Sequence, residues 1–410
     1  MKQTFSSTKI IAFLLLGLIL FSCESKTKDN EEALTDLSWE KIEQKAKGKT
    51  VNFMMWQGGP ELNNYINNYV VPTLKKKYDI NLEITGGQGP EIVQLVMGQK
   101  EAGIEEGQVD MAWINGETSF QLRKIDGLWG PFISELPNIE YVDLKDPYIN
   151  TDFQQPIAGM ECPWGISQFG MVYDSAKVEN PPQTLDELEA YVKKYPGTFT
   201  ISNDFTGMTV MKSFLAELGG SPNSLDGKFD EEKYDRLSKK LWDFINSNKE
   251  YFWKEGETFP KEQTKVAQLM ANGEIYVSYG FSEGGIEETV ISGLFPKSTR
   301  AYAWKNGTIK NSNYLGILDN APEKAAAMVV INFLISPEAQ FKKSHPDGAD
   351  LNTILTVDRL PEKWQKKFNN APKRKYGLEM EDLAENAIQE PAPEYMLRLY
   401  EDFRKKVIEK

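Results

Sequence analysis

Three apolar segments in the first third of the chain each end in a polar or glycine-containing turn, and each turn leads into residues with helical spacing. The segments are 51–56, 80–85 and 109–114. Strands that alternate with helices form a parallel sheet with right-handed crossovers, so the three turns are expected at one edge of that sheet. Ligands of open α/β sheets bind outside the carboxyl ends of the strands. The pattern therefore predicts a binding site at this edge.

The rest of the chain predicts a second lobe of helices and strands. Apolar and polar residues alternate over 166–173, which indicates a strand that crosses into this lobe. Shorter strands are predicted at 199–201 and 275–280, between amphipathic helices. Short strands near 301–317 are expected to cross back, and the two helices after them belong to the first lobe again. Because strands are expected to cross between the two lobes in both directions, we predict a hinge between the lobes.

The first residues indicate export. Lys2 and Lys9 precede a short apolar run that ends before Cys23, a pattern that resembles a bacterial lipoprotein signal peptide over residues 1–22. An uncleaved anchor helix is the alternative. Cys23 is the predicted lipidated residue, so we expect an exported protein that is lipid-anchored at the cell envelope. The charged, apolar-poor segment 23–50 is predicted to be a flexible tether, apart from a short helical piece near Trp39 to Ala46.

The predicted division of the remaining chain follows from these assignments. Lobe 1 comprises residues 51–157 and 300–349, and lobe 2 comprises residues 158–299 and 350–410. The lobes together exceed the size at which one hydrophobic core usually suffices.

Charge and composition exclude several kinds of function. The formal net charge is −13, and removal of residues 1–22 takes away two lysines and no acid, which gives −15. An acidic protein repels phosphate backbones, so no nucleic-acid partner is expected. His345 is the one histidine, and with Cys23 modified the one remaining thiol is Cys162. Hydrolytic triads, metal sites and cofactors therefore have few candidate residues, and we predict no enzyme, no metal and no cofactor.

Several motifs of the chain match a known family. The chain resembles the bacterial extracellular solute-binding proteins of ABC importers, and among them the YnjB-type members. The matching residues are Trp56 with Gly58-Gly59, Gly89-Pro90-Glu91-Ile92-Val93, Trp113-Ile114-Asn115-Gly116-Glu117, Pro163-Trp164-Gly165 with Gln168, Asp204-Phe205 with Gly207, and Asn332-Phe333-Leu334 with Ser336-Pro337-Glu338-Ala339-Gln340.

The resemblance implies a fold and a task. The fold is α/β, the two-lobe periplasmic-binding-protein fold of type II, in which each lobe is a mostly parallel sheet flanked by helices and crossing strands join the lobes. The task is to capture a small solute in the cleft between the lobes and to deliver it to the permease subunits of an ABC importer. The protein is expected to be a monomer held at the membrane through its lipid.

Such a cleft needs aromatic surface and a few fixed polar groups. The predicted ligand-binding residues are Trp56, Gln57, Gly58, Gly59, Gln88, Gly89, Asn115 and Glu117 from the first lobe, and Trp164, Gln168, Phe205, Thr206, Tyr279 and Glu283 from the second lobe and its crossing. Each also has a structural interpretation. Trp113 is assigned to the core, Trp56 and Trp164 suit either role, and the glycines either permit tight turns or let a ligand approach the backbone, which we favour.

The charge of the solute depends on three acids in the first turns of helices, Glu61, Glu91 and Glu117. Helix N-termini attract anions, and acids there commonly just stabilise the helix. If one of the three carboxylates points into the cleft, a cation enclosed by aromatic rings is favoured over an anion. Our hypothesis is a small organic cation such as thiamine or a polyamine. The alternatives are a sugar or an inorganic anion, a surface glycan-active enzyme with paired carboxylates, or a glycan-binding lipoprotein or adhesin.

Overall fold

A computed structural model describes residues 33–281, 285–345, 348–349, 351–378 and 383–410. The chain divides into two units, residues 1–37 and 38–410. In the first unit the described residues include the short 3-10 helix η1 (Leu34–Asp36). The predicted signal peptide and Cys23 lie outside the described residues.

Three parallel strands form one end of the main sheet. They are β1 (Thr50–Met55), β2 (Asn81–Gly86) and β3 (Met111–Ile114), in the order β2-β1-β3. β1 pairs with both neighbours in parallel. Parallel strands end at the same edge, so the turns after the three strands lie together there, as the apolar pattern predicted.

Helices follow these strands as predicted. They are α2 (Pro60–Tyr65), which continues through a π-helical turn (η2, Ile66–Val70) into α3 (Val71–Tyr78), then α4 (Gly89–Glu101) and α5 (Gly116–Lys124). Two later helices return to this part of the molecule, α12 (Lys324–Leu334) and α13 (Pro337–Ser344). We call these strands and helices the first lobe.

The segment assigned to the tether contains a packed helix. Helix α1 (Trp39–Ala46) contacts α12 and buries Ile42 and Ala46. The prediction that a flexible tether runs to residue 50 is therefore too long, because the apolar face of α1 is held against the first lobe.

Two long strands carry the sheet from the first lobe to the second. β7 (Glu161–Asp174) pairs antiparallel with β10 (Thr308–Leu318) along its first half, whereas its second half pairs with β8 (Val277–Phe281) and β9 (Thr299–Tyr302). β10 in turn pairs antiparallel with β3. The short strands predicted near 301–317 are thus joined over 308–318 into one strand, because the polar residues within β10 continue the ladder with β7. Cys162, near the start of β7, is fully buried.

The segment between α5 and β7 is largely irregular. It contains β4 (Leu128–Trp129), β5 (Thr151–Asp152), β6 (Gln155–Pro156), the short helix α6 (Pro147–Asn150) and the 3-10 helices η3 (Ile133–Glu135) and η4 (Pro137–Tyr141).

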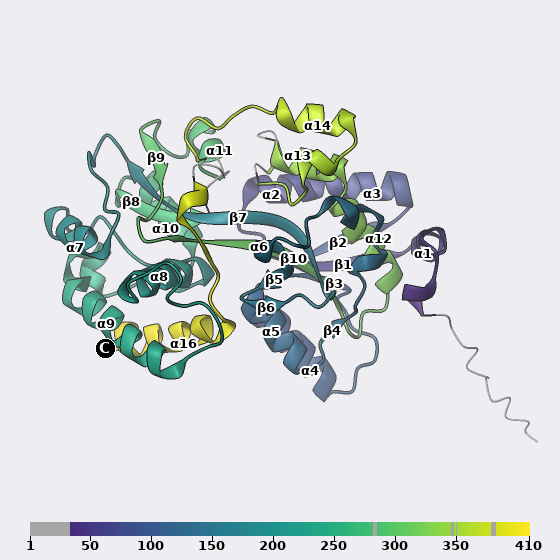
Figure 1. The fold of residues 1–410 in the computed structure, drawn as a ribbon, viewed down its shortest axis with the longest axis horizontal. Helices are drawn as coiled ribbons and strands as arrows, with labels where there is room; N and C mark the ends of the chain where they lie inside the picture. Colours follow the sequence, from purple (N-terminus) through teal and green to yellow (C-terminus); the bar gives the residue numbers. More distant parts are fainter. Residues whose placement is uncertain (1–32, 282–284, 346–347, 350, 379–382) are drawn as a thin grey trace, which may run out of the picture. The chain divides into compact units, whose positions relative to one another are not determined.

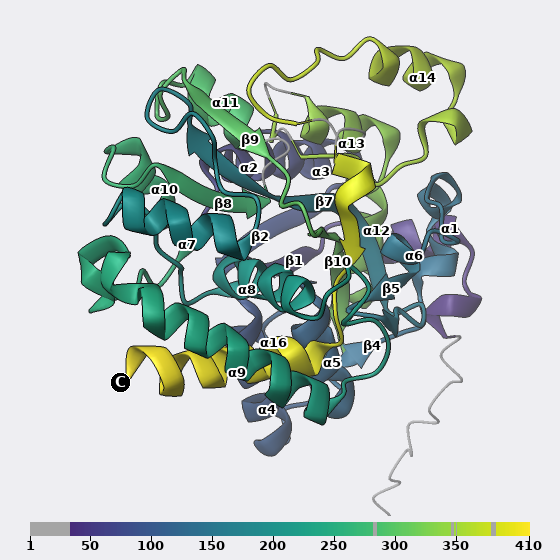
Figure 2. The same ribbon diagram turned by 60° about the vertical axis from the view of Figure 1, so that its left-hand side comes forward.

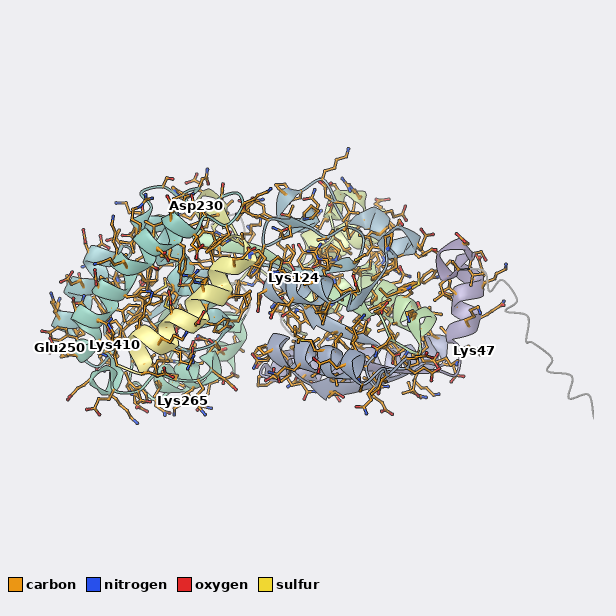
Figure 3. The ribbon with its side chains drawn as sticks, turned by 90° about the horizontal axis from the view of Figure 1, so that it is seen from below. Lys47, Lys124, Asp230, Glu250, Lys265 and Lys410 are labelled. Atoms are coloured by element: carbon orange, nitrogen blue, oxygen red, sulfur yellow. The ribbon has the colours of Figure 1, made fainter. Side chains whose placement is uncertain are left out.

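The second lobe, as we use the term, consists of helices packed around β8, β9 and the end of β7. Its helices are α7 (Leu185–Lys194), α8 (Phe205–Leu218), α9 (Glu231–Asn248), α10 (Gln263–Ala271), α11 (Gly285–Ile291) and α16 (Pro393–Phe403), with the short turns η5 (Lys249–Tyr251), η6 (Trp253–Gly256) and η9 (Arg404–Ile408). Figures 1 and 2 show α8, α9 and α16 side by side, and α8 contacts both of the others. Figure 3 shows Lys124, at the end of α5, close to the first turns of α16, in agreement with the contact between the two helices.

The second lobe differs from the prediction in two respects. β8 and β9 both run antiparallel to β7, so the sheet is mixed and not mostly parallel on this side. Residues 199–201 form no strand: the carbonyl of Phe199 accepts from the backbone N–H of Trp253 in η6, and the carbonyl of the preceding Thr198 accepts from that of Tyr276, so neither residue is part of a strand ladder.

The end of the chain belongs to both lobes. Helix α14 (Glu362–Asn369) packs on α13 of the first lobe, where Phe341 meets the rings of Trp364 and Phe368. The assignment of 350–410 to the second lobe alone is therefore wrong for this part. The 3-10 helices η7 (Val357–Arg359) and η8 (Ala384–Asn386) and strand β11 (Ala387–Gln389), which pairs with β10, complete the described elements. Among the described residues, no helix is long and apolar enough to span a bilayer.

Candidate functional site

The glycines at the edge of the first lobe are covered by the protein's own side chains. A Cβ on Gly58 would lie 2.3 Å from the indole of Trp56, and a Cβ on Gly87 would lie 2.1 Å from Met54. A Cβ on Gly89 would lie 2.1 Å from Thr118 Oγ1 and 3.6 Å from Glu117 Oε1. These glycines therefore allow side chains of this chain to approach the backbone, where we had predicted the approach of a ligand.

One of these close approaches gives a direct test. Gly89→Ala is expected to destabilise the protein by about 1–3 kcal/mol, because Thr118 is buried and β-branched and cannot easily move away. Gly98→Ala on the same helix is the matched control: nothing lies within 4 Å of its Cβ position, so a gain of about 0.5–1 kcal/mol is expected. Urea unfolding of both variants measures the difference. Equal effects would show that the contact at Gly89 is not as tight as described.

Three tryptophans form an edge-to-face series along the same edge. The ring centroids of Trp56 and Trp113 are 6.4 Å apart, and those of Trp113 and Trp164 are 5.2 Å apart. Trp56 is 38% exposed, Trp113 is half-buried and Trp164 is buried. The indole N–H groups of Trp113 and Trp164 donate to no described residue. Trp113, which we had assigned to the core, is therefore part of this aromatic series.

Of the three first-turn acids, Glu91 and Glu117 have different roles. The Glu91 carboxylate accepts a hydrogen bond from the backbone of Gln88, as part of a capping box, so it stabilises the start of α4. Glu117 is 7% exposed, and its Oε2 accepts no hydrogen bond from any described residue. Burial raises the pKa of this carboxyl to about 7. Of these two acids, Glu117 is therefore the one whose carboxylate has an oxygen, Oε2, without a hydrogen-bond donor among the described residues.

A buried ion pair lies next to Glu117. Lys212 of α8 donates to the carboxylate of Glu390, and the two side chains are 0% and 3% exposed. The pKa of Glu117 responds to both, since the charge of Lys212 lowers it and that of Glu390 raises it, both less than burial does. Phe153 joins the two sides: a Cβ on Gly116 would lie 2.1 Å from its ring, and the Lys212 ammonium lies 4.6 Å from its centroid.

The start of α8 supplies the second-lobe side of the site. Phe205 lies 6.3 Å from Phe153 between ring centroids, and 5.4 Å separates its centroid from the Lys212 ammonium. Asp204 caps the helix by accepting from the backbone of Gly207, and it also accepts from the backbone of Gln263. Thr206, in the first turn of the same helix, is partly exposed. Lys212, Glu390 and Phe153 complete a cluster with Glu117 and Phe205 that we call the charge cluster.

The remaining predicted site residues fall into two groups. Gln168 and Tyr279 are buried and hold the protein together, since Gln168 donates to Thr308 and to the backbone of Leu383, while the Tyr279 hydroxyl accepts from the backbone of Ser202. Gln57, Gln88 and Asn115 are exposed or partly exposed at the first-lobe edge. Glu283 lies outside the described residues.

A small hollow adjoins the charge cluster on the side of β10. It is lined by Pro147, Tyr148, Thr151, Phe153, Gln154, Lys310, Asn311, Gln389 and Glu390. It shares Phe153 and Glu390 with the cluster and contains none of the predicted ligand residues.

Sequence reasoning missed Lys212, Glu390 and Phe153. A signal for Lys212 was present, because it is a single cation within the apolar stretch 208–216 of a helix that is buried all round. A lysine in such a helix needs a buried partner. Its partner is 178 positions away, which no local pattern predicts. No group of three or more metal-ligating residues occurs in the described part of the chain.

A protein-family model and a protein of known sequence both match most of this chain, and both indicate the same family. Residues 69–372 match a family model described as bacterial extracellular solute-binding protein. Protein YnjB of Escherichia coli strain K12 is 32% identical over 353 residues, which is 85% of this chain and 88% of that protein.

Two solved structures have a similar fold. A putative spermidine/putrescine ABC transporter from Listeria monocytogenes gives a TM-score of 0.64 at 16% identity over 88% of this chain and 99% of that chain. The periplasmic binding protein AfuA from Actinobacillus pleuropneumoniae, with fructose-6-phosphate bound, gives a TM-score of 0.62 at 15% identity. The match covers 88% of this chain and 98% of that chain. At these identities the likeness is one of fold. It confirms the predicted two-lobe periplasmic-binding-protein fold, in which β7 and β10 are the crossing strands.

Proposed function

Because this chain belongs to the bacterial extracellular solute-binding proteins, we propose that it is the binding protein of an ABC importer for a small organic cation. The cation binds between the edge of the first lobe and the start of α8. The observation that carries the proposal is Glu117, a buried carboxylate at this edge whose Oε2 has no partner among the described residues. A buried carboxylate without a partner is unfavourable, and a bound cation removes that cost.

The aromatic rings around the site suit the same class of solute. Trp56 and Trp113 on the first lobe, with Phe205 on the second, are aromatic residues whose ring faces can bind an organic cation. Gln57 and Thr206 directly follow Trp56 and Phe205 in the chain, and Gln88 and Asn115 directly precede α4 and α5 at the first-lobe edge, so these four residues supply the polar groups. For Trp164, Gln168 and Tyr279, which are buried, a role in binding stays a prediction.

The alternatives are less well supported. An inorganic anion or a sugar phosphate, such as the fructose-6-phosphate in AfuA, would be repelled by Glu117. The spermidine/putrescine assignment of the Listeria protein agrees with a cationic solute. For a glycan-active enzyme, Asp152 and Glu161 are a pair of neighbouring carboxyls, but both are buried, and Arg123 forms an ion pair with Glu161. Retaining and inverting glycosidases need carboxyls that reach the substrate.

We also propose that Cys23 is lipidated after removal of residues 1–22, so that an anchored monomer presents its solute to the permease subunits. Mass spectrometry of the membrane fraction would detect diacylglycerol on Cys23, and Cys23→Ser should release the protein from the membrane. A soluble wild-type protein would contradict the anchor and leave the solute proposal intact.

Titration calorimetry tests the solute class. We expect heat from thiamine or from an organic amine, and none from sulfate, maltose or fructose-6-phosphate at the same concentrations. The affinity should rise with pH between 6 and 8, because the Glu117 carboxyl with a pKa of about 7 becomes charged over this range. Binding of maltose or of an anion alone would eliminate the cation.

A further inference from the structure

Three carboxylates surround the start of α8, and two of them, Asp204 and Glu390, accept hydrogen bonds from several groups of the protein. Asp204 accepts hydrogen bonds from Ser202 Oγ at 2.6 Å and from two backbone amides. Glu390 accepts from Lys212 through one oxygen and from Asn311 Nδ2, at 2.7 Å, through the other. Within the described residues of the charge cluster, Glu117 alone keeps a carboxylate oxygen without a donor.

Lys212 is itself bound as an organic cation would be. Its ammonium contacts a carboxylate and lies near the faces of two aromatic rings, 4.6 Å from the Phe153 centroid and 5.4 Å from that of Phe205. Carboxylates and aromatic faces together are the groups that recognise ammonium ligands in proteins. The protein therefore occupies one cation position with its own side chain.

We propose that Lys212 sets the charge of the solute, and that this protein selects a cation with one positive charge over a cation with two. The inference rests on the proposed function and deepens it. Asp204 and Asp152 accept hydrogen bonds from Ser202 and Ser119 and are not available to the solute. The remaining charged groups of the charge cluster, Glu117, Glu390 and Lys212, sum to one negative charge when all three are ionised. One positive charge on the solute balances that sum at Glu117.

A second positive charge has no counterpart in this cluster. It would either lie unpaired in a buried site or displace the Lys212 ammonium from Glu390, and both are costly where water is excluded. Lys212 therefore acts as a specificity-determining residue by repelling dications. Diamines and polyamines are disfavoured, and singly charged organic cations are favoured.

A matched pair of probes tests the inference. Butylammonium and 1,4-butanediammonium share a carbon chain and differ by one charge. For the wild-type protein, calorimetry should give at least about tenfold tighter binding of butylammonium, the change that one well-placed charge interaction commonly makes. Tighter binding of the diammonium ion would overturn the inference.

Variants of the cluster sharpen this test. Lys212→Met raises the summed negative charge to two, so the preference should reverse by at least about tenfold. If that variant fails to fold, Lys212→Met/Glu390→Gln restores the sum to one negative charge and should again prefer butylammonium. Lys310→Met is the control, since Lys310 also lies over an aromatic ring, 4.7 Å from the centroid of Tyr148, but outside the charge cluster. A ratio that changes equally in both single variants would contradict the role of Lys212.

The outcome also separates this inference from the proposed function. If thiamine and both ammonium probes fail to bind while maltose or fructose-6-phosphate binds, the proposed function fails. If both ammonium probes bind and the diammonium ion binds more tightly, the proposed function stands and the role of Lys212 fails.

Discussion

Replacing Lys212 by methionine is expected to lower the free energy of unfolding by about 3–5 kcal/mol, the cost of breaking a buried ion pair on one side. Lys212 and Glu390 are both almost fully buried, so the variant leaves the Glu390 carboxylate in the interior with only the Asn311 amide as a donor. The fall should appear in the midpoint of urea unfolding, with an unchanged slope if the native state keeps its compactness.

Two controls define this result. Lys212→Met/Glu390→Gln should recover most of the loss, because a neutral amide in place of Glu390 can still accept from Asn311. Lys239→Met breaks a pair with Asp243 in which the side chains are 77% and 66% exposed, and should cost less than about 1 kcal/mol. A Lys212 variant no less stable than the Lys239 variant would show that the pair is not buried in solution.

Glu117→Gln is expected to stabilise the protein at pH 8 and to impair its binding of cations. Burial raises the pKa of the Glu117 carboxyl from 4.5 to about 7. The folded state therefore holds the proton more tightly than the unfolded state does, and this contribution to stability is complete below pH 4.5 and is lost as the pH rises through 7. Glutamine imitates the protonated form at every pH. The variant should equal the wild type near pH 4.5 and exceed it at pH 8 by up to roughly 3 kcal/mol.

Binding should change in the opposite direction. Loss of a charge-assisted contact to a cation commonly weakens affinity by about ten- to a hundredfold. Thermal unfolding between pH 4.5 and 8 and calorimetry at pH 8 measure the two effects on the same samples. Glu61→Gln is the control, since Glu61 also lies in the first turn of a helix but its side chain is partly exposed, and a change within about 0.5 kcal/mol is expected. A Glu117→Gln variant that is less stable at pH 8 would indicate a structural partner for the carboxylate.

The parts of the fold that depend on local pattern could be predicted from the sequence. The three strand-turn-helix units of the first lobe were correct because a buried parallel strand and the helix after it leave separate periodicities in the chain. The crossing strand was recognised for the same reason, although β7 extends five residues further toward the N-terminus, to Glu161, than the predicted strand from Ile166.

The parts of the fold that depend on contacts between residues far apart in the sequence could not be predicted. The antiparallel register of β8 and β9 on β7 is decided by chain path and leaves no signal in either strand. The residues of the candidate site likewise could be predicted only where the local sequence indicates them. Glu117 was a candidate because of its place after β3, whereas Lys212 meets Glu390 across 178 positions. The glycines were assigned to a ligand because the sequence does not reveal that Trp56, Met54 and Thr118 cover them.

The buried position of Cys162 makes the protein suitable for fluorescence experiments. Burial raises the pKa of its thiol, and the thiolate is the form that reacts with maleimides, so Cys162 should remain unlabelled. Once Cys23 is replaced, cysteines introduced away from the proposed site, at the exposed Gln94 on α4 of the first lobe and at the exposed Lys239 on α9 of the second, would be the reactive ones. A donor and an acceptor dye at these two sites would report, by energy transfer, whether the distance between the two lobes changes when a solute binds.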